Sequence, residues 1–449
     1  MESSKSIRQS LIFFLSTALI STLLCIHPLI ASTYFSVIPN SIVNFGFCVI
    51  LLTAVFAWMI LGLSSADPEK VPMCAVLAGL TFHLQSASAT ALPLLKYTSG
   101  LEHAEAAAAS DEYIKYIFLF LGSFLVAWGL IFVLRLLIRL RNKVASMLMM
   151  IANVIIMAVL LLFNDGFGTT VIHDVQVGLP LLAYLFLVTA YGYHAFLSGN
   201  PETEIILFGN RKLSALLFLA SETALLMGYI GCSEFGIPIY FALVMVIWFY
   251  LYLPEKSVKT FSIVTAVVGG IGALVMGYYF LYYRSLAEED RVIKDFHRLG
   301  SKIGRIFEQP EQTRNALERI RSGGFFGNMG YRYLPEATTD FSIALSTHYV
   351  GILWLMITIF LLGYLAFTGN QYFRKEEHRL QLIPQFGFLC ILCLSTMNIL
   401  GNLGKLGIIG VSCYSSGYGK TVYVLSGMLM GFVLYPSNAN LGIRIGKSS

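Results

Sequence analysis

Residues 316–341 contain the side-chain types that a catalytic or anion-binding site needs. The candidates there are Arg319, Arg321, Gly323, Gly324, Glu336 and Asp340, and the basic residues Lys302 and Arg305 precede them. Guanidinium groups stay charged and offer forked donors that suit diphosphates and other anionic head groups. A carboxylate beside apolar residues can act as a general base, because a drier environment raises its pKa.

Simpler interpretations exist for the same residues. Asp340 precedes the apolar residues 341–345, so its short side chain could cap the first turn of a helix. Capping and base chemistry are compatible, because a cap would hold the carboxylate in place. The arginines, together with Arg314, could form a solvated helix face or contact anionic lipid, and Glu336 could be a solvated loop carboxylate.

The composition places this polar segment on a membrane protein. Of 449 residues, 57% are hydrophobic and only 12% are charged, which is too little charge for a water-soluble surface of this size. Apolar runs of about 20 residues, the length of a bilayer crossing, recur along the chain. We therefore predict an all-α, polytopic bundle of about 10–12 transmembrane helices.

Length and hydropathy indicate a set of candidate spans. They cover residues 11–31, 40–63, 72–95, 116–138, 145–163, 177–197, 214–232, 236–253, 260–282, 344–368, 382–403 and 420–437. The third span is the weakest, because it contains His83, Gln85 and several serines and threonines. For His83 we expect hydrogen bonds between helices. For Cys390 and Cys393, whose CxxC spacing lies in an apolar run, we expect packing rather than redox or metal chemistry.

Basic residues in the short connections indicate the orientation of the helices. They include Arg139, Arg141, Lys143, Arg211, Lys212, Lys256, Lys259, Arg374, Lys375, Arg444 and Lys447. Placing them in the cytoplasm puts both termini inside. We then expect an N-terminal bundle (1–282), a large extracytoplasmic catalytic-type loop (283–343) and a C-terminal three-span bundle (344–449). The net charge of +5 is explained by these connections and does not indicate a nucleic-acid partner.

The polar segment resembles a known signature. Residues 316–327 followed by 334–341 are similar to the signature of the SEDS family (shape, elongation, division and sporulation proteins), which includes RodA, FtsW and SpoVE. Residues 164–169 resemble the family's Gln-Pro-Asp-x-Gly-Thr element, and residues 302–310 resemble the segment that opens its large loop. Three spans follow the loop, as in the family.

The resemblance implies a peptidoglycan glycosyltransferase of the bacterial cytoplasmic membrane that polymerises lipid II during cell elongation or division. Asp340 would be the base that deprotonates the acceptor sugar, with inversion at the donor carbon. Substrate would be bound by Glu336, Arg319, Arg321, Lys302, Arg305, Gly323 and Gly324. A divalent cation, Mg²⁺ or Mn²⁺, is a candidate cofactor without assigned ligands. The implied partners are lipid II, membrane lipids and a class B penicillin-binding transpeptidase.

The chain also departs from the family pattern. His348 and Tyr349 stand where the family usually has two acids before the glycine equivalent to Gly351, and residues 412–419 replace its Ser-Tyr-Gly-Gly-Ser loop. Two other function classes therefore stay open. They are a flippase or transporter of a polyprenyl-linked substrate, and a non-catalytic scaffold of a wall-synthesis complex. An enzyme needs the Asp340 carboxylate, and a scaffold tolerates its loss. A transporter depends on charges on both membrane faces or at mid-depth, and the sequence shows few of those.

Overall fold

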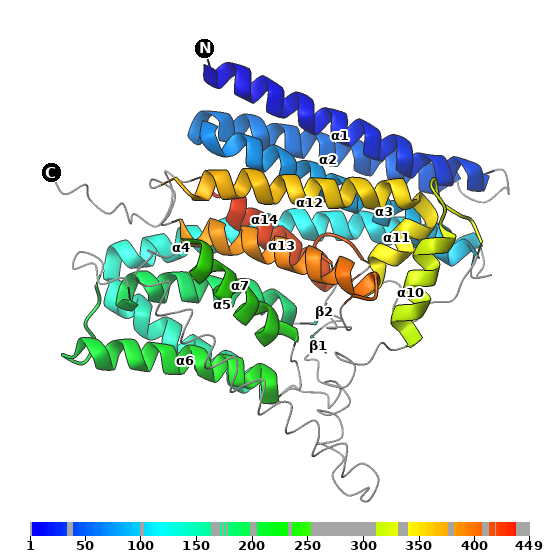
Figure 1. Cartoon of the computed structure of the whole chain (residues 1–449). Coiled ribbons are helices and arrows are strands. Elements are labelled where there is room, and N and C mark those ends of the chain that lie inside the picture. Colours follow the sequence, from blue (N-terminus) through cyan, green and yellow to red (C-terminus); the bar gives the residue numbers. More distant parts are fainter. Residues whose placement is uncertain are drawn as a thin grey trace, which may run out of the picture.

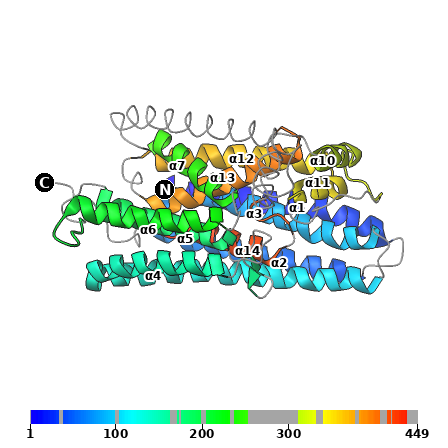
Figure 2. The ribbon, with the colours of Figure 1, turned by 90° about the horizontal axis from the view of Figure 1, so that it is seen from below.

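A computed structural model of the chain shows a bundle of long helices, most of which lie side by side along one axis (Figures 1 and 2). It describes residues 2–33, 39–98, 103–162, 171–172, 175–176, 178–197, 204–231, 236–252, 311–330, 340–375, 381–405, 413–417 and 419–436. The predicted all-α, polytopic architecture is confirmed. One small addition is an antiparallel pair of two-residue strands, β1 (Val171–Ile172) and β2 (Val175–Gln176).

The described helices fall into three groups along the chain. The first group is α1 (Glu2–Thr33), α2 (Pro39–Ala66), the 3₁₀ turn η1 (Pro68–Lys70), α3 (Val71–Thr98) and α4 (His103–Leu162). The second group is α5 (Gly178–Gly192), continued by the π-helical η2 (Tyr193–Leu197), then α6 (Arg211–Gly231) and α7 (Gly236–Tyr252). The last group is α10 (Glu311–Ser322), α11 (Ser342–Val350), α12 (Ile352–Phe373), α13 (Leu382–Asn402) and α14 (Lys420–Leu434).

Among the residues that the structure describes, six helical segments are long and apolar enough to cross a membrane. They are Ser6–Ala31, Ser41–Ala66, Asp111–Leu136, Asn142–Leu162, Ile352–Phe373 and Leu382–Asn402, and three shorter apolar helices accompany them. Helices occupy the predicted spans throughout the described residues, whereas the predicted span 260–282 lies outside them. Most of the predicted loop 283–343 also lies outside, so the three regional boundaries stay predictions.

One expected span was wrong in its extent. Residues 344–368 were expected to form a single helix, but the helix ends at Val350 and a new one begins at Ile352. Gly351 separates them with a φ of +111°, a conformation that favours glycine. The contacts that require this break are described with the candidate site.

α4 supplies two of the expected crossings. Trp128, in its first half, donates a hydrogen bond to the Gly431 carbonyl of α14 at 2.8 Å. In its second half, Asn142 Oδ1 accepts from Tyr191, and Asn153 Oδ1 accepts from Tyr184, so this half runs antiparallel to α5. Figure 1 shows the first half running past α14 and the second half returning beside α5 and α6.

α3 is buried along almost all of its length and contacts α1, α2, α4, α11 and α12. The His83 ring pairs through Nδ1 with the Ser21 hydroxyl at 2.8 Å and through Nε2 with the Trp354 carbonyl at 3.1 Å. It also stacks on the Trp354 ring. The expected helix-to-helix role of His83 is confirmed. α3 tolerates polar residues because protein, not lipid, surrounds it. The described cysteines are free and buried, Cys390 and Cys393 among them, as expected for packing residues.

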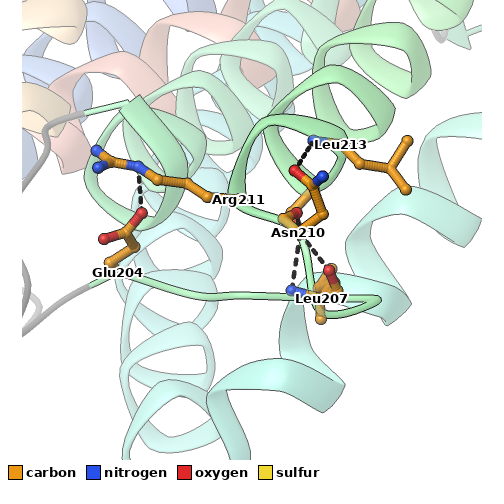
Figure 3. A network of polar contacts seen from close by, with 6 residues as sticks. Glu204, Leu207, Asn210, Arg211 and Leu213 are labelled. Carbon is orange, nitrogen blue, oxygen red and sulfur yellow. Dashed lines mark hydrogen bonds and ion pairs between the residues drawn. The ribbon is translucent and has the colours of Figure 1, made fainter.

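The start of α6 shows a helix end that the local sequence specifies (Figure 3). Asn210 Oδ1 accepts a hydrogen bond from the Leu213 backbone N–H at 3.1 Å, which satisfies a first-turn donor. Arg211 forms an ion pair with Glu204 beside it.

A buried lysine ties together the bundle end that contains η1. Lys70 is fully buried, and its Nζ donates to the Tyr435 carbonyl after α14 at 2.8 Å. Tyr372, near the end of α12, donates to Asp67 Oδ2 at 2.7 Å. Burial lowers the pKa of Lys70, while Cys74 and Asp67 nearby act in the opposite direction. These contacts join the α2–α3 connection to the ends of α12 and α14.

Glycine packing between α14 and α4 leads to a stability prediction. A Cβ at Gly431 would lie 2.8 Å from Ala127 Cβ and 2.9 Å from the Phe124 carbonyl oxygen, whereas a Cβ at Gly122 of α4 meets nothing within 4 Å. We expect Gly431→Ala to destabilise the protein by about 1–3 kcal/mol, the usual effect of overpacking. Gly122→Ala should leave stability unchanged or raise it slightly. Thermal unfolding in detergent micelles measures both variants, and equal melting temperatures would contradict this packing.

Candidate functional site

The predicted site residues that the structure describes lie at the bundle end that contains α10 and α11. α10 crosses the ends of the long helices next to α11 (Figure 1). Every residue of α11 is buried. Glu336, Lys302 and Arg305 lie outside the described residues, as do residues 164–169, so what was expected of them stays a prediction.

Amide side chains from α13 hold Asp340 at the start of α11. Asn398 Nδ2 and Asn402 Nδ2 each donate a hydrogen bond to the Asp340 backbone carbonyl at 3.0 Å. Asn402 Oδ1 accepts from the Ala344 backbone N–H at 2.9 Å. A single asparagine of α13 therefore fixes the main chain on both sides of the first turn of α11.

The expectation that the Asp340 side chain caps this helix was wrong. Phe341 occupies the cap position, without a side-chain cap hydrogen bond, and Asn402 satisfies the Ala344 N–H instead. Asp340 itself is half-buried. Asp340 thus has a main chain held by α13 and lies half-buried directly before the cap position of α11.

Sequence reasoning missed Asn398 and Asn402. Two asparagines four residues apart near the end of an apolar helix share one face, and that spacing was the available signal. Asn402 Nδ2 also donates to Asn398 Oδ1 at 3.0 Å and to the Asn398 carbonyl at 2.8 Å, which orients the pair. Their partners are 58 and 62 residues earlier in the chain, a separation that local patterns do not reveal.

The two described arginines of the predicted substrate site lie in different environments. Arg319 is fully buried, with its guanidinium carbon 5.6 Å from the Tyr349 ring centroid and Nη2 3.5 Å from the Tyr349 hydroxyl. Arg321 is exposed. Residues two apart on a helix point in different directions, so these arginines do not form one anion-binding face. Arg319 supports the packing of α10 on α11, and Arg321 remains open to a ligand.

His348 and Tyr349, which replace the two acids of the family pattern, attach α10 to α11. His348 Nε2 pairs with the Gly330 carbonyl at 2.7 Å, and its Nδ1 pairs with the Ser322 hydroxyl at 3.2 Å. Tyr349 supplies the ring beneath Arg319. This chain therefore joins the two helices through imidazole and phenol groups at these positions.

The glycine-rich turn after α10 packs main chain against main chain. Asn328 N donates to the His348 carbonyl at 2.7 Å, and Ile352 N donates to the Gly324 carbonyl at 2.9 Å. A Cβ on Gly323 would lie 2.6 Å from the Thr347 carbonyl oxygen.

Two further glycines complete this contact. A Cβ on Gly327 would overlap the Tyr349 carbonyl, and one on Gly351 would overlap the Phe325 carbonyl. Close packing of the two backbones therefore requires glycine at these positions. The same packing explains why the helix breaks at Gly351. Substrate binding by Gly323 and Gly324 stays a prediction.

A buried polar loop connects α3 to the start of α11. Residues 413–417 are buried, and Ser415 Oγ accepts from Gln85 Nε2 at 2.8 Å. Ser416 donates to Ser342 Oγ at 3.2 Å, two residues after Asp340. The sequence indicated that this loop diverges from the family, but it did not reveal that the loop is buried beside α11.

The described residues give no support to a cation site. Within those parts of the chain, no three His, Cys, Asp or Glu side chains gather closely enough to hold a metal ion. Glu336 lies outside them. We derive no chemical step through a cation, and Mg²⁺ or Mn²⁺ stays a prediction.

The role of Asn402 can be tested by hydrogen exchange. Asn402→Leu removes the hydrogen bonds to Asp340 and Ala344. The Ala344 amide should therefore exchange at least about fivefold faster, given roughly 1 kcal/mol for the bond that it loses. Asn402→Asp keeps an acceptor for Ala344 and loses the donor to Asp340, so it should have an intermediate effect. The measurement is hydrogen–deuterium exchange followed by mass spectrometry on peptides that cover residues 340–347. Unchanged exchange in the leucine variant would contradict capping by α13.

Comparison with known proteins places this arrangement in a family. A family model for FtsW, RodA and SpoVE, described as cell cycle protein, matches residues 211–440, which include Asp340, the glycine-rich turn and α13. The chain is 26% identical over 235 residues to a Bacillus subtilis (strain 168) protein described as a probable peptidoglycan glycosyltransferase FtsW. That alignment covers 45% of this chain and 58% of the relative. Because the family model spans more than half of the chain, this protein belongs to the cell cycle protein family of FtsW, RodA and SpoVE.

Proposed function

We propose that this protein is a membrane glycosyltransferase that polymerises lipid II into the glycan strands of peptidoglycan. One observation carries the proposal: two asparagines of α13 hold the main chain of Asp340 in place at the end of the bundle, where α11 begins. The family supports it, because a B. subtilis relative is described as a probable peptidoglycan glycosyltransferase.

In the proposed reaction the Asp340 carboxylate takes the proton from the 4-hydroxyl of the acceptor sugar. The resulting oxygen attacks the anomeric carbon of the donor, a C–O bond forms, and the bond to the lipid diphosphate breaks with inversion. The electron pair and negative charge pass to the leaving diphosphate. A half-buried position strengthens such electrostatic interactions relative to water.

The diphosphate needs positive charge as it leaves. Arg321 is the described candidate, since it is exposed at the same end of the bundle. Lys302, Arg305 and Glu336 keep their proposed substrate-binding roles. Arg319 contributes indirectly, because it holds α10 against Tyr349 and so keeps Arg321 in place. Gly323 and Gly324 shape the turn that brings these parts together.

The proposed setting is the bacterial cytoplasmic membrane, with Asp340 at its outer face and both termini in the cytoplasm. Basic residues such as Arg211 and Arg374 lie at the other ends of the helices, in agreement with this orientation. The proposed partner is a class B penicillin-binding transpeptidase, which would cross-link the strands made during elongation or division.

A flippase of a polyprenyl-linked substrate is the second candidate. It is favoured by a buried carboxylate inside the helices: Glu222 of α6 accepts a hydrogen bond from the Thr189 hydroxyl of α5. Ionisable groups within a membrane commonly mark transport pathways. Glu222→Gln would abolish flipping of a fluorescent polyprenyl-diphosphate lipid by a flippase, and it would leave an Asp340-dependent polymerase active.

Asp340→Asn should lower the rate of lipid II polymerisation at least about 100-fold, the lower end of what a general base contributes. The main-chain hydrogen bonds to Asn398 and Asn402 remain, so the melting temperature should not change. The assay follows glycan strands made from labelled lipid II by the purified protein together with its transpeptidase.

Glu69→Gln is the matched control, because Glu69 is an exposed carboxylate in an ion pair with Lys375 at the opposite end of the bundle. Polymerisation by Asp340→Asn at the unaltered rate would refute the assignment of the base. Absence of product from the unaltered protein with its partner would favour the flippase or the scaffold.

A further inference from the structure

Phe325 and Phe326 form an exposed aromatic pair beside the candidate site. Their side chains are 53% and 59% exposed, and their rings meet edge to face with centroids 4.8 Å apart. Large apolar rings gain free energy when they are removed from water, so the exposure of two neighbouring rings needs an explanation. Large apolar residues that are exposed on the long helices face lipid. This pair lies instead in the turn after α10, so its exposure needs a separate explanation.

Hydrogen bonds fix the height of this pair along the bundle. Leu353 N donates to the Phe325 carbonyl at 3.3 Å, so the turn lies level with the first residues of α12. α12 has 22 residues, which gives a length of about 33 Å and matches the hydrocarbon core of a bilayer. Its first turn therefore marks the edge of the hydrocarbon, and the phenylalanine pair lies at that edge.

The exposed apolar surface of α12 points toward lipid. Its most exposed large residues are Met356, Ile359, Phe360 and Phe367. The phenylalanine pair is exposed too, and its turn is bonded to the start of this helix. Exposed Arg321 precedes the pair in the chain, in the last turn of α10. Aromatic rings flanked by a basic residue are typical of the zone between acyl chains and anionic head groups.

We propose that Phe325 and Phe326 insert into the bilayer interface beside the first turn of α12 and anchor the glycine-rich turn to the lipid surface. α10, which crosses the ends of the long helices (Figure 1), then lies along that surface. The occupant of this apolar patch is lipid: acyl chains contact the rings, and anionic head groups contact Arg321. This proposal rests on the membrane architecture and does not depend on the proposed reaction.

The test places a tryptophan at the patch of the full-length protein in phosphatidylcholine vesicles with brominated acyl chains. Phe326→Trp reports the interface, and Phe360→Trp reports the lipid-facing middle of α12. Fluorescence of the unaltered protein, which contains four tryptophans, is subtracted. Bromine near the carbonyl end of the chains should quench Trp at 326 about twofold more than bromine near the methyl end, and the order should reverse at 360. Aqueous iodide should quench neither strongly.

Two outcomes would overturn the proposal. Strong iodide quenching without bromine quenching at 326 would place the ring in water. Protection from both quenchers would mean that protein, either another segment of this chain or a partner, covers the pair. If Phe326→Trp does not elute as a folded protein in size-exclusion chromatography, Phe325→Trp reports on the same patch.

Discussion

The contact between two stretches of main chain, residues 323–328 and the junction at Gly351, determines how this end of the protein is built. Only glycine lets the backbones come so close, because a Cβ on Gly323, Gly327 or Gly351 would meet a carbonyl oxygen. The contact ends α11, starts α12 and holds α10 across the helix ends. Asp340 lies at the other end of α11. Its position is fixed by this contact, which holds α11, and by the α13 asparagines, which bond to its carbonyl.

The membrane imposes the second constraint. Polar groups in the interior of the bundle must find partners in the protein, because lipid offers none. α3 meets this requirement by sharing its polar side chains with neighbouring helices and with the buried 413–417 loop, as Gln85 does with Ser415. Buried polar contacts thus extend from α3 through the 413–417 loop to Ser342, two residues after Asp340, while the outer surface of the bundle stays apolar. A lipid-linked substrate needs that combination, with an apolar surface for its chain and a polar end for its head group.

The sequence predicted what local patterns encode. Apolar length predicts the helices, such as Ser41–Ala66, and adjacent glycines at 323 and 324 predict a turn after α10. Contacts between distant residues were not predictable: the cap of α11 comes from Asn402, and Arg319 is buried on Tyr349 although arginines near a helix end suggested an exposed cluster. The break at Gly351 was missed because residues 344–368 are apolar on both sides of it, and only the carbonyl of Phe325 requires a glycine there.

The central claim is that the end of the bundle around Asp340 receives a lipid-linked sugar. Photo-cross-linking with a lipid II analogue that carries a diazirine on its donor sugar tests this most directly. We predict cross-linked peptides from residues 321–328 and 340–350. Cross-links confined to the opposite end, around the exposed pair Glu69 and Lys375, would contradict the account.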